Sequence, residues 1–142
     1  MNKPKILLGS EAFKVRLEKV SKKGKKSILV QAMTFEGDEA GEWLIKTMKE
    51  SPAKVKRLLV DSYSKVVIND HFIFSLKYWK DQDFRDEVKS TKRLIKKAKE
   101  NGIEVRFTNP VGLIGQKYPL RNHKKMVIVD NEICYLGGIN FS

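Results

Sequence analysis

The chain has 142 residues, which is enough for one domain with a hydrophobic core. Its 29 lysine and arginine residues outnumber its 17 aspartate and glutamate residues, and the net charge of +12 suits anionic partners such as nucleic acid or acidic lipid headgroups. A solvated basic surface without a partner is the alternative. One cysteine, Cys134, excludes an intrachain disulfide, and no apolar run approaches the roughly 20 residues of a membrane-spanning helix.

Helices and strands are predicted to alternate, because stretches with apolar residues at helical spacing are separated by short runs of β-branched residues. In chain order we expect a helix at 11–21, a strand at 27–34, a helix at 38–49, a strand at 55–61, a helix at 84–100, a strand at 103–108 and a hairpin with strands at 126–129 and 133–136 around a turn at 131–132. Ser10 and Asp38 are the predicted N-caps of the first two helices. The alternation predicts an α/β fold, a layered α/β/α sandwich with a mixed, largely parallel sheet and helices on both faces.

Two connecting segments are candidates for binding. The lysine-rich turn at 22–26 could hold a phosphate, although a solvated turn between helix and strand is the preferred interpretation. Residues 109–122 form a loop with Gly and Pro residues immediately before the predicted hairpin, where binding residues often lie. Arg121 is therefore a candidate substrate-binding residue.

The most informative stretch lies near the C-terminus and combines an imidazole, an ammonium, a carboxylate and an amide. His123, Lys125 and Asp130 follow the spacing His-x-Lys-x4-Asp, and Gly-Gly-Ile-Asn follows at 137–140. Because side chains alternate along a strand, His123 and Lys125 are expected on one face. Asp130 should point elsewhere and act as a supporting residue. This set of groups suits phosphodiester chemistry without a metal.

The chemistry follows from the residue types. The imidazole of His123 can act as a nucleophile near neutral pH, and a phosphodiester under attack gathers charge on its non-bridging oxygens. Lys125 and Asn140 are suited to stabilise that charge, and Gly138 lets the backbone approach a ligand closely. The alternative is a surface strand with ordinary polar residues, which the complete spacing makes the less favoured interpretation.

This segment resembles the signature of the phospholipase D superfamily, the HKD motif. Residues 27–41, 56–61 and 102–110 also resemble strands and a helix start of that family. The Gly-Gly-Ile-Asn sequence and residues 118–122 are most similar to the N-terminal half of cardiolipin synthase-like phosphatidyltransferases. Nuclease members more often carry Ser at the second glycine position.

The resemblance implies a mechanism with two motif histidines. One attacks phosphorus and becomes phosphohistidine, while the other protonates the leaving alcohol and then activates the incoming water or alcohol. His123 would be one of the two, with Lys125 and Asn140 binding phosphate and Asp130 as the motif aspartate. No metal or cofactor is expected. His71, the other histidine, does not fit the motif.

We therefore expect residues 1–142 to form one catalytic half-domain, cut short at its C-terminus, whose second motif lies in an absent half or a homodimer mate. The expected function is a phospholipase D-like hydrolase or phosphatidyltransferase acting on glycerophospholipids. Two alternatives stay open: a metal-independent endonuclease or phosphodiesterase working as a homodimer, and an inactive isolated half-domain. The expected location is cytoplasmic, with peripheral membrane contact as an option and nucleic acid as the less favoured partner.

Overall fold

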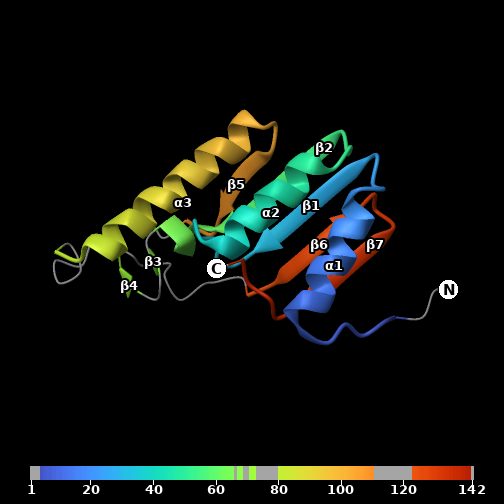
Figure 1. The fold of residues 1–142 in the computed structure, drawn as a ribbon, viewed down its shortest axis with the longest axis horizontal. Helices are drawn as coiled ribbons and strands as arrows, with labels where there is room; N and C mark the ends of the chain where they lie inside the picture. Colours follow the sequence, from blue (N-terminus) through green and yellow to red (C-terminus); the bar gives the residue numbers. More distant parts are fainter. Residues whose placement is uncertain (1–3, 66, 69–70, 73–79, 111–122, 142) are drawn as a thin grey trace.

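The computed structural model describes residues 4–65, 67–68, 71–72, 80–110 and 123–141. Within these ranges the predicted helices and strands alternate up to residue 108, with η1, β3 and β4 inserted between β2 and α3, and a hairpin follows (Figure 1). The elements are α1 (Gly9–Ser21), β1 (Ser27–Ala32), α2 (Glu39–Glu50), β2 (Val55–Asp61), the 3-10 helix η1 (Ser62–Lys65), β3 (Val67–Ile68), β4 (His71–Phe72), α3 (Gln82–Glu100), β5 (Glu104–Thr108), β6 (Lys125–Val129) and β7 (Ile133–Gly137).

A five-stranded mixed sheet forms the centre of the molecule, in the order β5-β2-β1-β6-β7. β1, β2 and β5 are parallel to one another, because α2 and α3 carry the chain back between them. β6 runs antiparallel to β1, and β7 runs antiparallel to β6 as the return strand of the hairpin. The predicted mixed α/β sheet is confirmed. β3 and β4 pair in a separate two-stranded sheet.

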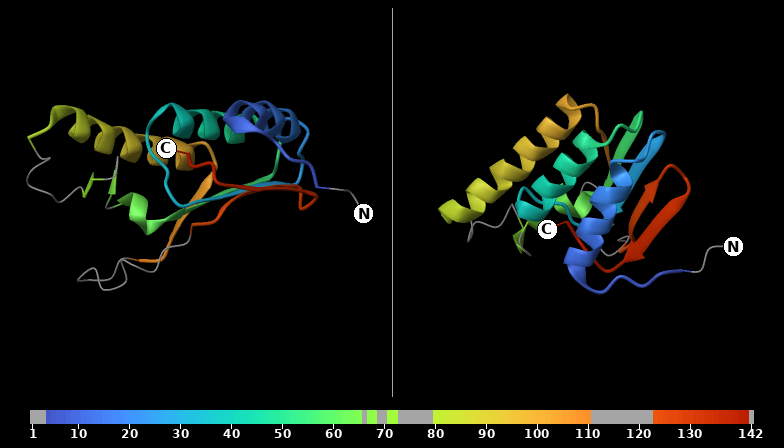
Figure 2. Two further views of the ribbon diagram at one scale, coloured as in Figure 1. Left: turned by 90° about the horizontal axis from the view of Figure 1, so that it is seen from below. Right: turned by 45° about the vertical axis from the view of Figure 1, so that its right-hand side comes forward.

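The helices α1, α2 and α3 all lie on the same face of the sheet (Figure 2, left). Side chains alternate accordingly: Val30, Val60 and Val127 face the helices and are at most 3% exposed, whereas their neighbours Leu29 and Ile128 are only half-buried. The predicted layered α/β arrangement is therefore present. The prediction of helices on both faces is wrong for the described ranges, in which the second face of the sheet carries no helix.

The first two helices show one correct and one wrong cap prediction. The Asp38 side chain accepts a hydrogen bond from the Gly41 N–H at 2.9 Å and caps α2, as predicted. Ser10 does not cap α1, because this helix begins at Gly9 and Ser10 lies within its first turn. None of the described helices combines the length and apolar character needed to cross a membrane.

The segment after β7 turns back into the protein instead of following the sheet. Phe141 forms an isolated parallel bridge with Phe35, and its carbonyl oxygen accepts a hydrogen bond from the Glu36 N–H at 3.1 Å. The Phe141 ring is 2% exposed and packs at 6.3–6.4 Å, between ring centroids, from those of Trp43 and Phe13. This packing fixes the chain immediately after the predicted ligand Asn140.

Candidate active site

The ends of five strands meet at one edge of the sheet, where Lys125 and the Gly-Gly-Ile-Asn segment lie. The parallel strands end there at Ala32, Asp61 and Thr108, and we call this edge the carboxyl edge. β6 begins at the same edge, and the register of the hairpin places Lys125 directly opposite Gly137. The two parts of the motif that are separated in sequence, the lysine and the Gly-Gly-Ile-Asn segment, therefore meet.

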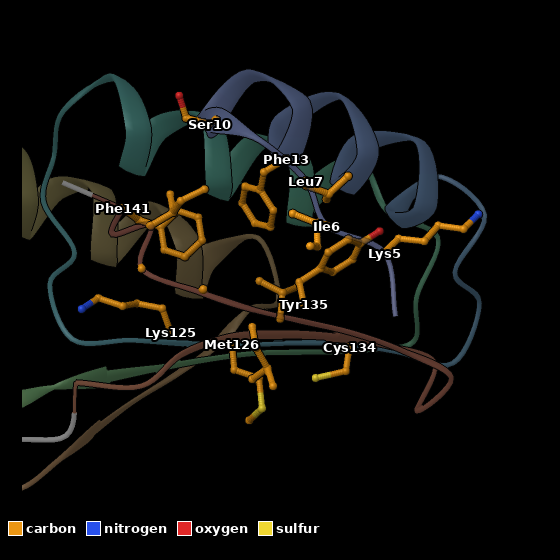
Figure 3. Close-up of a pocket in the computed structure, with 16 residues that line it drawn as sticks. Lys5, Ile6, Leu7, Ser10, Phe13, Lys125, Met126, Cys134, Tyr135 and Phe141 are labelled. Carbon is orange, nitrogen blue, oxygen red and sulfur yellow. The ribbon is translucent and has the colours of Figure 1, made fainter. Parts of the chain in front are cut away.

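A cavity of about 430 Å³ lies between α1, with the segment before it, and the hairpin (Figure 3). Lys125, Gly137 and Gly138 contribute to its lining. Apolar side chains form much of the remaining wall: Ile6, Leu7, Phe13, Tyr135, Ile139 and Phe141. Figure 3 shows the ammonium of Lys125 beyond the end of the hairpin, pointing away from the aromatic rings. The cavity thus combines a largely apolar wall with two cationic side chains, Lys125 at one end and Lys5 at the other.

The motif histidine and lysine differ in their surroundings. His123 lies two residues before β6 and is exposed, so a substrate can reach it without a change in the fold. Lys125 is half-buried and is the first residue of β6. The orientation of the His123 ring relative to Lys125 stays a prediction. In the described ranges, no three His, Cys, Asp or Glu side chains gather into a group able to hold a metal ion.

Asn140 carries an unmet hydrogen-bonding group. Its Oδ1 atom is buried and has no hydrogen-bond partner among the described residues. A buried amide group without a partner is costly, and such groups are commonly completed by a ligand or an ordered water. The space above Gly138 is open, since an added Cβ atom would meet nothing within 4 Å. The open space at Gly138 suits the predicted approach of a phosphate; the buried Oδ1 is an acceptor, so Asn140 would bind phosphate through its Nδ2 donor while Oδ1 meets a hydroxyl or water.

Asp130 lies at the opposite end of β6 from Lys125. Five residue steps separate the two along an extended strand, which corresponds to roughly 16 Å. The Asp130 carboxylate accepts hydrogen bonds from the backbone N–H groups of Lys25, Lys26 and Ser27, at 2.8, 2.8 and 2.9 Å. The bond from Ser27, followed by that from Lys25, lowers the pKa of this carboxyl below its ordinary value. Asp130 therefore fixes the loop before β1 and does not join the phosphate-binding groups.

A family model described as the PLD-like domain of cardiolipin synthase matches residues 18–142. The chain belongs to this phospholipase D-like family. No curated protein matches the chain. The membership confirms the resemblance to the phospholipase D superfamily and places the chain among proteins of phosphodiester transfer and hydrolysis.

The lysine-rich turn at 22–26 does not offer an open phosphate site of the kind considered from the sequence. The amides of its last residues and of Ser27 already bind the motif aspartate of this PLD-like domain. Gly24 is also required, because a Cβ atom there would lie 2.7 Å from Cγ1 of Val129. The turn and the hairpin are therefore packed against each other.

Sequence reasoning missed polar residues that lie on the same carboxyl edge. Asp61 is 1% exposed, and its carboxylate accepts hydrogen bonds from the Tyr63 N–H at 2.8 Å and from Nδ2 of Asn109 at 2.7 Å. Ser64 is 3% exposed, and its hydroxyl forms hydrogen bonds with the backbone of Met33 and Phe35, directly after β1. The signal was available: polar residues at the carboxyl ends of parallel strands often line sites in α/β proteins.

Two further sequence predictions have different outcomes. Arg121 and the rest of 111–122 lie outside the described residues, so the proposed substrate contact stays a prediction. His71 lies in β4, and its ring packs edge-on against Phe84 with 6.3 Å between centroids. This packing agrees with the interpretation that His71 is not a second motif histidine.

Proposed function

We propose that the chain is one catalytic half of a phospholipase D-like hydrolase or phosphatidyltransferase that acts on glycerophospholipids. The observation that carries this proposal is the register of the hairpin, which sets Lys125 opposite Gly137 at the mouth of an apolar cavity. A phospholipid has both features that such a site selects, an anionic phosphodiester and an apolar body. With the phosphate bound at the end that carries Lys125, the apolar part of the lipid would occupy the cavity.

In the proposed reaction, Nε2 or Nδ1 of His123 attacks phosphorus, and the bond to the leaving alkoxide breaks. A second histidine donates a proton to that alkoxide. It then takes a proton from water or from an acceptor alcohol, which attacks phosphorus and breaks the P–N bond of phosphohistidine. Lys125 and Asn140 bind the non-bridging oxygens, where charge accumulates in both transition states. No metal takes part.

The second histidine has to come from another motif. His71 packs in β4, and the sequence contains no other histidine besides His123. PLD-like domains often act as dimers or as paired halves. We propose that a second HKD half, in another domain or a second copy of this chain, faces His123. Cytoplasmic location with peripheral membrane contact is part of the same proposal.

The alternative is a nuclease of the same superfamily that works as a homodimer. The net charge of +12 and the single His-x-Lys motif favour it. The two functions differ in their response to salt. DNA binding weakens steeply as the salt concentration rises, because the counterions released on binding then contribute less free energy, whereas turnover of a phospholipid depends on micelles or bilayers.

The decisive experiment compares two histidine variants. We expect His123→Ala to lower turnover of micellar phosphatidylglycerol and of bis(4-nitrophenyl) phosphate by at least about 10³-fold, since the nucleophile is lost. His71→Ala is the matched control and should keep turnover within about threefold. Acid-labile phosphate on the protein, trapped by rapid quench, should appear in the wild type and in His71→Ala but not in His123→Ala, with or without a chelator.

Four outcomes discriminate among the candidates. Unchanged turnover in His123→Ala contradicts the proposed role of this residue, and restoration of chelator-treated protein by a divalent metal contradicts the metal-free mechanism. Cleavage of DNA in preference to lipid supports the nuclease. Absence of turnover and of phosphohistidine in every sample supports the inactive isolated half-domain.

A further inference from the structure

Ser64 holds the chain where it leaves β1. This residue lies in η1, directly after β2, and is 3% exposed. Its hydroxyl donates a hydrogen bond to the Met33 carbonyl oxygen at 3.1 Å and accepts one from the Phe35 N–H at 3.0 Å. One side chain thus satisfies two backbone groups on either side of Thr34, in a place with little access for water. The direction in which the chain leaves β1 depends on this hydroxyl.

The segment that Ser64 holds is paired with the predicted phosphate-binding segment. Phe35 forms the parallel bridge with Phe141, and the Glu36 N–H donates to the Phe141 carbonyl oxygen. Phe141 directly follows Asn140, and both bridged residues are at most 2% exposed. A continuous series of backbone contacts therefore connects the Ser64 hydroxyl with the Asn140 side chain.

We propose that Ser64 is a positioning residue for phosphate binding. It fixes the exit of β1, the exit of β1 fixes the Phe141 segment, and that segment sets the place of the Asn140 amide relative to Lys125. This inference rests on the proposed function, because it takes Asn140 as a phosphate ligand. Displacement of a binding group by about 1 Å can lower rates by about 10²-fold, so a positioning contact of this kind matters for activity.

The chain offers a matched control on the same short helix. Ser62 is 7% exposed, and within the described residues its hydroxyl makes no hydrogen bond to the exit of β1. Ser62→Ala and Ser64→Ala each remove one hydroxyl oxygen from η1, but only Ser64→Ala should affect Asn140. Ser64→Cys is a further variant, because a thiol fills the site with little loss of packing and bonds weakly.

The test is a titration of the full chain with inorganic phosphate, followed by NMR of the side-chain amide of Asn140. We expect Ser64→Ala and Ser64→Cys to weaken phosphate binding about fivefold and to shift the Asn140 resonances before phosphate is added. Ser62→Ala should leave both unchanged. In a background of Asn140→Ala, the change at Ser64 should weaken binding no further, because the two residues act in series.

Each result bears on one proposal. Equal phosphate affinities of the Ser64 and Ser62 variants overturn the positioning role. It is also overturned if the loss of phosphate affinity caused by Ser64→Ala adds in full to the loss caused by Asn140→Ala in the double variant. If Ser64→Ala does not fold, the thiol variant decides by the same criteria. A wild-type chain that does not bind phosphate, or an Asn140→Ala variant with undiminished affinity, overturns the proposed phosphate site itself and is thereby distinguishable from failure of the Ser64 inference alone.

Discussion

The residues at 123–130 divide between the proposed site and structural support. His123 and Lys125 lie at the carboxyl edge, where a cavity and an amide with unmet hydrogen bonds are close by. Asp130 lies at the other end of the strand and satisfies the amides of a turn. A carboxylate that accepts several backbone hydrogen bonds is stabilised in its charged form, which explains its lowered pKa. The motif spacing therefore encodes a strand with a site at one end and a structural contact at the other.

The lowered pKa of Asp130 predicts how stability depends on pH. Since the pKa is lower in the folded state, this group stabilises the protein fully above its unfolded pKa of about 3.9 and loses this effect as pH falls through the folded pKa. We expect Asp130→Asn to lower the melting temperature at pH 7, and the difference from wild type to shrink below about pH 4.

Glu132→Gln is the control for that measurement. Its carboxylate is 71% exposed and pairs with Lys26 at 3.5 Å, an arrangement that contributes little to stability. Thermal melts followed by circular dichroism between pH 3 and pH 7 compare the three proteins. A difference between wild type and Asp130→Asn that is constant over this range would show that the charge of Asp130 has no part in stabilising the loop.

At the scale of elements, local sequence patterns predicted the helices and strands well. The second parallel strand was predicted at 55–61 and is found at Val55–Asp61. The first strand was predicted to reach residue 34 but ends at Ala32. The chain there turns to bond with Ser64 and Phe141, both distant in sequence, so no local pattern could indicate where the strand stops.

The hairpin was predicted, but its turn is shifted by one residue. Asp130 and Asn131 both have positive φ, 56° and 60°, and the Glu132 N–H donates to the Val129 carbonyl oxygen. Asp and Asn tolerate this conformation better than most residues, which explains why the turn centres on them. A two-residue turn at 131–132 would pair Lys125 with Gly138, whereas the observed hairpin pairs Lys125 with Gly137. The roles of Ser64 and Asp61 required the neighbours that only the parallel strands supply.

Gly24 tests the contact between the turn at 22–26 and the hairpin. We expect Gly24→Ala to destabilise the protein by about 1–3 kcal/mol, because the new methyl group would overlap with the β-branched side chain of Val129. Gly138→Ala is the matched control, since its methyl group would meet no other atom. Urea denaturation measures both. Equal stability of the two variants would show that the turn can move away from the hairpin without cost.

At the scale of the whole molecule, the sheet has two unlike faces. The face toward the helices is buried, and the other is largely apolar at its centre without a covering helix in the described ranges (Figure 2). Five side chains make up this open apolar surface: Leu29, Leu59, Met126, Ile128 and Leu136. Leu136 is 76% exposed. An apolar surface of this kind is uncommon on a protein that acts alone.

Two neighbouring residues of β6 test this asymmetry. Val127→Asp places a charge among the helices and should prevent folding, since Val127 is 2% exposed. Ile128→Asp, on the open face, should leave a folded protein that binds less of the dye ANS and associates less. Circular dichroism, dye fluorescence and sedimentation compare them. Similar unfolding by both substitutions would show that the second face is covered as completely as the first.

The bridge between Phe35 and Phe141 also bears on the synthesis of this protein. The bridge joins the segment that follows the first strand to the last described residues, so it forms only after a very large loop of chain has closed. A nascent polypeptide on the ribosome can already contain the parallel strands and their helices before the segment with Asn140 has a fixed position. Assembly of the candidate site thus requires synthesis of the chain through Phe141.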